Sequence, residues 1–224
     1  MTRTALLLLA DGRFPAGGHA HSGGVEAAVA ARTVHDPATL LAFCRGRLHT
    51  SGLTAAALAA AAAAGHDPLD LDGAAAARTP APALRATARK LGRQLLRAAR
   101  AIWPCEALDR LARDLPGGAH HPVVLGVTAT AAGLTGPDAA HAVALDHVSG
   151  PAAAAVRLLG LDPFDATAVV ARLCDDVEAV ARRAADAADR VRDEGTAALP
   201  AACAPLLDIT AEQHAVRPVR LFAS

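Results

Sequence analysis

The residues best suited to chemistry are concentrated in one short stretch near the start of the chain, residues 14–26, FPAGGHAHSGGVE. It contains two histidines, His19 and His21, which are separated by a single residue. Two neutral imidazoles suit nickel or zinc as ligands. A stable site needs further ligands, however, and no third ligand is clustered with these two. We therefore expect neither a metal centre nor a bound cofactor in the isolated chain.

The same stretch contains Ser22 in the sequence AHSGG, a variant of the nucleophile elbow of α/β-hydrolases. That motif requires a preceding strand and a surrounding parallel sheet. Position 22 leaves no room for the earlier strands, so we do not expect Ser22 to be catalytic. The simpler alternative is a closely packed glycine-rich turn, with Ser22 at the start of a helix and Glu26 in its first turn, where a carboxylate suits the helix dipole.

Residue spacing also argues against two other kinds of site. The cysteines stand at positions 44, 105, 174 and 203, too far apart for a Cys-x-x-Cys clamp or a zinc finger, and we expect them to be buried thiols. Lys90 is the only lysine and lies in the sequence RKLG. A Walker A loop requires Gly-Lys followed by Ser or Thr, so the chain is not expected to be a P-loop nucleotidase.

The helix predicted over residues 83–101 has a stripe of arginines spaced four, four, four and three residues apart: Arg85, Arg89, Arg93, Arg97 and Arg100. No acidic residue occurs between Asp72 and Glu106. One interpretation is a solvated helix face. Another is a docking surface on which arginine forks bind the carboxylates of an acidic partner. RNA or an anionic membrane is a third interpretation, which the zero net charge of the chain makes less favourable.

The elements that must position these residues belong to a chain of 224 residues, 53% of them hydrophobic and 20% charged, which indicates a folded protein with a sizeable core. Basic and acidic residues number 22 each, and this balance argues against a whole-chain nucleic-acid binder. The longest apolar run, residues 54–65, is shorter than the roughly 20 residues that span a bilayer. The apolar stretch at residues 5–10 is too short for a signal peptide. We expect a cytoplasmic protein that binds neither nucleic acid nor membrane.

Helical periodicity is present in almost every segment, and β-branched and aromatic runs are scarce. The pattern predicts a single all-α domain of about ten helices over residues 1–224. Residues 65–82 are expected to be a loop with at most one short helix, and residues 216–224 a flexible tail. Helices are expected at residues 3–10, 22–32, 37–49, 51–64, 83–101, 105–115, 136–159 and 163–194, with a last short one before the tail.

Four blocks of the sequence, in this order, resemble motifs of the urease accessory protein UreF family. The first is the stretch at residues 14–26 described above. The others are HPVVLG at 121–126, VSGP running into AVRLL at 148–159, and PLLDI through to RLFAS at 205–224. Each block alone has modest specificity for the family, but the ordered set is specific and spans nearly the whole chain. The chain departs from the family at His19 and Gly23, which stand where the family has aromatic residues.

The resemblance implies an all-α homodimer with no catalytic centre. It implies that the protein binds a second accessory protein, UreD or UreH, and then recruits the GTPase UreG, and that this assembly docks on apo-urease and delivers nickel. The partner-binding residues are expected in the turn and the tail: Pro15, Gly17, Gly18, His19, His21, Ser22, Glu26, Arg217, Arg220, Leu221 and Phe222. The tail is expected to become ordered when the second accessory protein binds.

Three alternatives remain open from the residues alone. The turn at residues 14–26 would need the same residue types if it served packing only. The chain could be a small all-α protein that binds RNA or an anionic surface through the arginines of residues 85–100. It could also be a metal-dependent enzyme built on His19, His21 and a distant acid.

Overall fold

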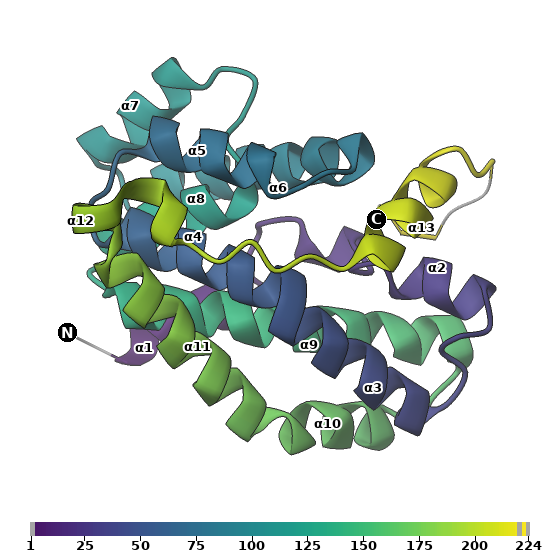
Figure 1. Ribbon diagram of the computed structural model, residues 1–224. Coiled ribbons are helices and arrows are strands. Elements are labelled where there is room, and N and C mark those ends of the chain that lie inside the picture. The colour runs from purple at the N-terminus through teal and green to yellow at the C-terminus, as the bar shows by residue number, and fades with distance from the viewer. Residues whose placement is uncertain (1–2, 219–220, 223–224) are drawn as a thin grey trace.

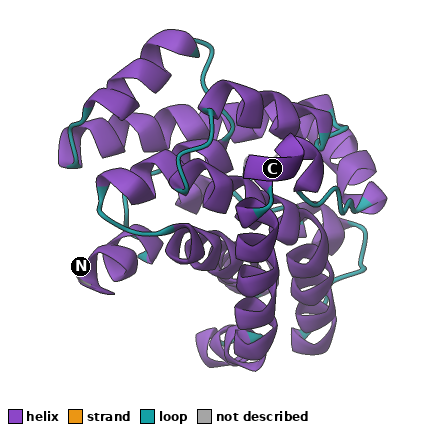
Figure 2. Ribbon diagram, turned by 60° about the vertical axis from the view of Figure 1, so that its left-hand side comes forward, coloured by secondary structure: helices purple, strands orange, loops and turns teal. Residues whose placement is uncertain are grey.

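The computed structural model describes residues 3–218, 221 and 222. The chain is 75% helical, without a strand in that described part, and eleven of its helices have seven or more residues. Figure 2 shows these helices joined by loops, most of them short. The expected all-α domain of about ten helices is therefore confirmed. None of the described helices is both long and apolar enough to cross a membrane.

Three short turns lie between the α-helices: the 3-10 turns η1 (Gly18–Ala20) and η3 (Gly195–Ala198), and the π-helical turn η2 (Leu48–Gly52). The α-helices are α1 (Arg3–Ala10), α2 (Val25–Ala30), α3 (Pro37–Arg47), α4 (Leu53–Ala63), α5 (Pro68–Ala77), α6 (Pro82–Ile102), α7 (Glu106–Asp114), α8 (His121–Ala131), α9 (Gly136–Leu159), α10 (Pro163–Arg172), α11 (Cys174–Asp189), α12 (Val191–Glu194) and α13 (Pro205–Ala215).

Helix α4 forms the centre of the core and packs against α8, α9 and α11 (Figure 1). Nine of its eleven residues are buried, and most of these are alanines. Small side chains let neighbouring helices approach closely. At Gly126 of α8, a Cβ atom would overlap the carbonyl oxygen of Ala59, so α8 and α4 meet backbone to backbone. The core is thus built from many close contacts between small residues.

Several helix starts follow the local signals of the sequence. The Asp36 carboxylate accepts a hydrogen bond from the Thr39 N–H, and the Thr39 hydroxyl accepts one from the Asp36 N–H. This reciprocal capping box, with Pro37 in the first turn, starts α3 as expected. Thr135 and Asp138 form a second capping box at the start of α9, which covers the predicted range 136–159.

One predicted range was wrong in detail. The segment 163–194 is three helices rather than one, and the first break falls at Leu173, whose side chain is fully buried at the junction. The short helix allowed within the loop predicted at 65–82 is α5, which has ten residues. It is capped by Asp67, whose carboxylate accepts a hydrogen bond from the Leu69 N–H. Burial of Leu71 against the core stabilises this helix.

The cysteines also differ from expectation. Cys44 is buried, and burial raises the pKa of its thiol to about 11. Cys105 is half-buried, whereas Cys174 and Cys203 are exposed. The expectation of four buried thiols was therefore wrong. Cys174 is the first residue of α11 and is exposed at the surface.

Candidate partner-binding site

The stretch at residues 14–26 forms a turn that is fixed at its first end by packing. The Phe14 ring is buried and stacks on Trp103, with 5.8 Å between the ring centroids. Gly17 has a positive φ of 82°, and a Cβ atom there would overlap the side-chain amide of Gln94 on α6. The positive φ therefore favours glycine at this position, and a larger residue would also displace the Gln94 side chain. Pro15 and Gly18, in contrast, are exposed and available to a partner.

The second end of the turn is held from inside the molecule. The Ser22 side chain is completely buried, and its hydroxyl accepts a hydrogen bond from the Glu26 N–H at 3.4 Å. Gly23 and Gly24 both have positive φ, so α2 begins at Val25 and not at Ser22, as the sequence had suggested. A Cβ atom on Gly23 would lie 3.0 Å from Pro151 and 3.1 Å from the Arg47 guanidinium. An aromatic residue at this position, as the family resemblance implied, would require those neighbours to move.

Glu26 connects this turn to the other end of the chain. Its carboxylate accepts hydrogen bonds from the backbone N–H groups of Leu221 and Phe222, at 2.8 and 3.0 Å. It also forms a 2.9 Å hydrogen bond with the ring of His214, the most buried polar side chain of α13. The Phe222 ring is buried, and the guanidinium carbon of Arg157 lies over it, 4.7 Å from the centroid of the ring. One carboxylate therefore ties together α2, α13 and the end of the chain.

The environment of Glu26 favours the charged carboxylate. Burial by itself would raise the pKa of Glu26, but the hydrogen bonds from Leu221, His214 and Phe222 outweigh it and lower the pKa below its ordinary value. At neutral pH the carboxylate is therefore ionised and can accept from all three donors at once. The arrangement is a structural clamp, and none of its geometry indicates a bond-breaking reaction.

Helix α13 presents an apolar face beside this clamp. Leu206 and Val216 are 76% and 83% exposed, and Ile209 and Leu221 are also exposed. Positions 206, 209 and 216 fall within one side of a helix with 3.6 residues per turn. On its inner side, α13 packs against α2 and α6 (Figure 1), and Leu207 lies against Gly24. We call Leu206, Ile209, Val216 and Leu221 the α13 face. Exposed apolar groups of this kind typically contact a partner.

The other candidate residues of the turn and tail lie around the clamp. His19 belongs to the 3-10 turn η1, and His21, which follows it, is half-buried. Arg217 is half-buried and its N–H donates to the His214 carbonyl. Arg220 lies outside the described residues. The flexibility expected of residues 216–224 stays a prediction, although Leu221 and Phe222 bond to Glu26 in this structure. Within the described part of the chain, no three His, Cys, Asp or Glu side chains are grouped closely enough to hold a metal ion.

The arginine stripe of α6 is largely engaged within the protein. Arg85 donates to the carbonyls of Thr79 and Pro80, and Arg93 donates to that of Gly117. Arg100 pairs with Asp109 on α7. Arg97 is exposed and makes no hydrogen bond or ion pair to the part of the chain that the structure describes. Most of the stripe therefore joins α6 to the loops beside it.

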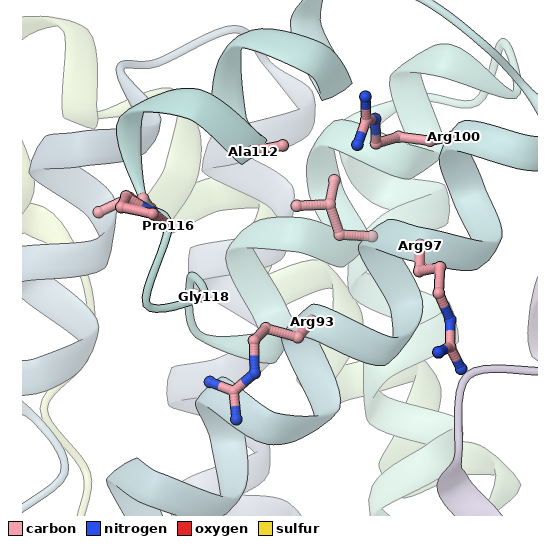
Figure 3. A pocket seen from close by; sticks show the side chains of 8 residues that line it. Arg93, Arg97, Arg100, Ala112, Pro116 and Gly118 are labelled. Atoms are coloured by element: carbon pink, nitrogen blue, oxygen red, sulfur yellow. The ribbon is translucent and has the colours of Figure 1, made fainter.

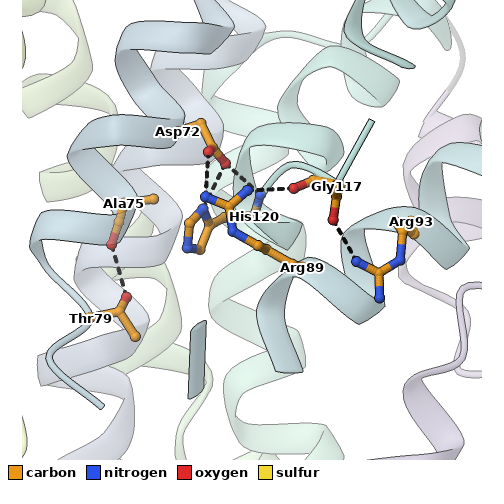
Figure 4. Close-up of polar contacts among 8 residues, drawn as sticks. Asp72, Ala75, Thr79, Arg89, Arg93, Gly117 and His120 are labelled. Atoms are coloured by element: carbon orange, nitrogen blue, oxygen red, sulfur yellow. Dashed lines mark hydrogen bonds and ion pairs between the residues drawn. The ribbon is translucent and has the colours of Figure 1, made fainter. Parts of the chain in front are cut away.

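Arg89 belongs to a buried network that the sequence did not reveal (Figure 4). It donates to the Gly118 carbonyl and pairs at 2.9 Å with Asp72 of α5. The other Asp72 oxygen accepts from the N–H and the ring of fully buried His120, at 2.7 and 2.6 Å. Burial would raise the pKa of Asp72, but the bonds and charges of His120 and Arg89 lower it. This network ties α5 to α6 and to the start of α8.

His214, Arg157, Asp72 and His120 were all absent from the predicted set. A lone histidine on a short helix carries no sequence signal for its partner, and His214 meets Glu26 across 188 positions. The only available signal was indirect, because an acid such as Asp72 within an alanine-rich apolar segment is buried only when it is paired.

Comparison with known proteins gives one consistent result. A model of the UreF family matches residues 34–174. A urease accessory protein UreF of Mycobacterium sp. (strain JLS) is 44% identical over the whole of this chain and 99% of its own length. The UreF protein of Mycolicibacterium vanbaalenii is 43% identical, over 98% of this chain and 97% of its own. The UreF protein of Mycobacterium tuberculosis H37Rv is 41% identical over the full length of both.

The expected resemblance is thus confirmed from one end of the chain to the other, including the turn and α13, which lie outside the segment that the family model matches. This protein belongs to the UreF family of urease accessory proteins.

Proposed function

We propose that this protein is a non-enzymatic adaptor in the delivery of nickel to urease. In this proposal it works as a homodimer, binds the second accessory protein UreD or UreH, and thereby recruits the GTPase UreG to apo-urease. Its full-length similarity to urease accessory proteins supports a role in urease maturation. The adaptor role and the individual partners are our inference from the family.

The observation that carries the proposal is the α13 face beside the Glu26 clamp. Four large apolar side chains are exposed there, on a helix and tail that the clamp holds in place. Leaving them in water costs free energy that burial against a partner would recover. A preorganised apolar surface also loses little conformational entropy on binding. We place the UreD or UreH contact on this face.

The alternative role, binding of RNA or an anionic surface through the arginine stripe, has weaker support. Four of the five arginines already bond to groups of the same chain. Arg89 in particular is paired with the buried Asp72, so the stripe as a whole is not available to follow a phosphate backbone. The zero net charge adds no general attraction for a polyanion.

Co-purification tests the adaptor role. The tagged protein is co-expressed with UreD and UreG of the same organism, as wild type and as the double variant Leu206→Ser, Ile209→Ser. Wild type should retain both partners. The double variant should lose most of both, while its melting temperature stays close to wild type because the two side chains point into solvent.

A matched control separates this surface from exposed apolar groups in general. Phe164 is 82% exposed at the start of α10, a helix that contributes no residue to the clamp, and Phe164→Ser should retain both partners. If wild type retains neither partner, the adaptor role is wrong. If the double variant retains both at wild-type levels, the adaptor role stands but the α13 face is the wrong surface.

A further inference from the structure

A groove between α6 and α7 is the second feature of the surface with the character of a binding site. Its volume is about 210 Å³. Its rim is formed by the three C-terminal arginines of the α6 stripe, and its floor by apolar groups of α6 and the end of α7. Among the residues that line it are Arg93, Arg97, Arg100, Leu96 and Leu115. None of the described residues that line the groove is acidic.

The three arginines differ in how far they are already engaged. Arg93 is exposed and makes one hydrogen bond, to the Gly117 carbonyl. Arg100 pairs with Asp109, but both side chains are nearly half exposed, and an incoming carboxylate can replace such a pair at little cost. Arg97 makes no such bond within the described chain. In Figure 3, Arg100 extends on the side of α6 nearer Ala112, and Arg93 and Arg97 extend on the other side.

These features define the chemistry of an occupant. A guanidinium binds a carboxylate through two parallel hydrogen bonds, and such charge-assisted pairs are stronger than neutral ones. Leu96 and Leu115 offer an apolar floor between the charged groups. Positions 93 and 100 are separated by seven residues of α6, or about 10 Å along the helix. About three residues of an extended chain cover the same length.

The geometry points to this groove as a docking site for an acidic segment of a protein partner. The segment places one apolar side chain on the floor at Leu96 and Leu115. The carboxylates that flank this apolar residue bind the arginines of the groove. The main partner is Arg97. This inference is independent of the adaptor role, because the groove lies on α6 and α7 while the proposed partner contact lies on α13.

An acidic protein segment fits the groove better than a nucleic acid does. No aromatic side chain lines the groove in the described structure, so there is no platform on which a base could stack. A phosphate backbone would also leave the apolar floor uncovered. The arginines would be satisfied by either ligand, so RNA is included as a competitor in the test.

The test measures the anisotropy of a fluorescent synthetic peptide at low salt. The peptide has one leucine flanked by glutamates, and it is titrated with the full-length protein. Arg97→Ala should weaken binding about tenfold, the change expected for one charge-assisted pair. Arg97→Glu should abolish binding. Replacing the leucine of the peptide by serine should weaken binding to the wild-type protein.

Lys90→Ala is the matched control. It removes the same charge from an exposed position of the same helix, away from the groove, and should leave the affinity nearly unchanged. The melting temperature of each variant shows that it remains folded. The inference is overturned if the peptide does not bind, if Arg97→Glu binds it as wild type does, or if glutamine replaces glutamate in the peptide without loss. It is also overturned if a single-stranded oligouridine binds more tightly and displaces the peptide.

Discussion

The Glu26 carboxylate accepts hydrogen bonds from three donors that belong to the last helix and the tail. Glu26→Ala would leave the buried His214 and two backbone N–H groups without their acceptor. We expect this change to lower the free energy of unfolding by about 2–3 kcal/mol, the cost of stranding buried donors. That exceeds the roughly 0.5–1 kcal/mol expected if Glu26 interacted only with the dipole of α2. Urea unfolding measures the difference.

Glu106→Ala is the control at this scale. Glu106 also lies in the first turn of its helix, but it is exposed, and its pair with Arg110 lies at the surface. Its removal should cost no more than about 0.5 kcal/mol. Equal losses for the two variants would show that the clamp adds nothing to the stability of the fold.

At the scale of one helix, α6 carries two arginines of the same stripe in opposite situations. Arg89 reaches the buried Asp72 and the Gly118 carbonyl, whereas Arg97 reaches no partner within the described chain. Arg89→Ala leaves a buried carboxylate without its cation, and we expect a loss of about 2–4 kcal/mol in the free energy of unfolding. Arg97→Ala should change it by less than about 0.5 kcal/mol.

Thermal and urea unfolding of both variants check this contrast. The two substitutions remove the same side chain from the same helix, so differences in helix propensity and net charge cancel. Similar small effects would mean that the stripe is a solvated face throughout. Similar large effects would mean that Arg97 also has a structural partner, which would weaken its assignment to the groove.

For the whole molecule, a falling pH should lower the free energy of unfolding in two stages. Burial and the charge of Arg47 lower the pKa of His147 well below 6.5, and burial lowers the pKa of His121 despite the opposing charge of Asp146. Because the unfolded histidines protonate near 6.5 and the folded ones do not, stability falls as the pH drops below that value. Glu26 and Asp72 have lowered pKa values, so their contributions are present above 4.5 and 3.8 and are lost below.

Melting temperatures measured from neutral pH down to about pH 3 test both stages. His147→Gln should reduce the slope of the first stage, and Glu26→Gln that of the second. A melting temperature that stays constant until the pH falls below 4.5 would show that the histidines do not contribute.

The sequence by itself determined the all-α fold, most of the helices and the family. These features depend on interactions within a few residues of the chain, so a local sequence pattern can predict them. They include the alanine-rich periodicity, the pair Asp36–Pro37 and the glycines of the turn. The sequence did not predict the break between α10 and α11 at Leu173. Helical periodicity continues through this position, and the break depends on the burial of the Leu173 side chain. Likewise, the sequence identified Glu26 and the tail separately but could not join them.

Only the tertiary structure decided which of these residues meet. The pairing of Glu26 with His214, 188 residues away, depends on how α2 and α13 cross, as does the contact of Leu207 with Gly24. The same holds for the arginine stripe, whose regular spacing predicts one face but assigns no partners. Arg89 is structural because α5 brings Asp72 beside it, and Arg97 is free for a partner because no described acceptor reaches it. Such contacts depend on the packing of distant helices, which local patterns do not encode.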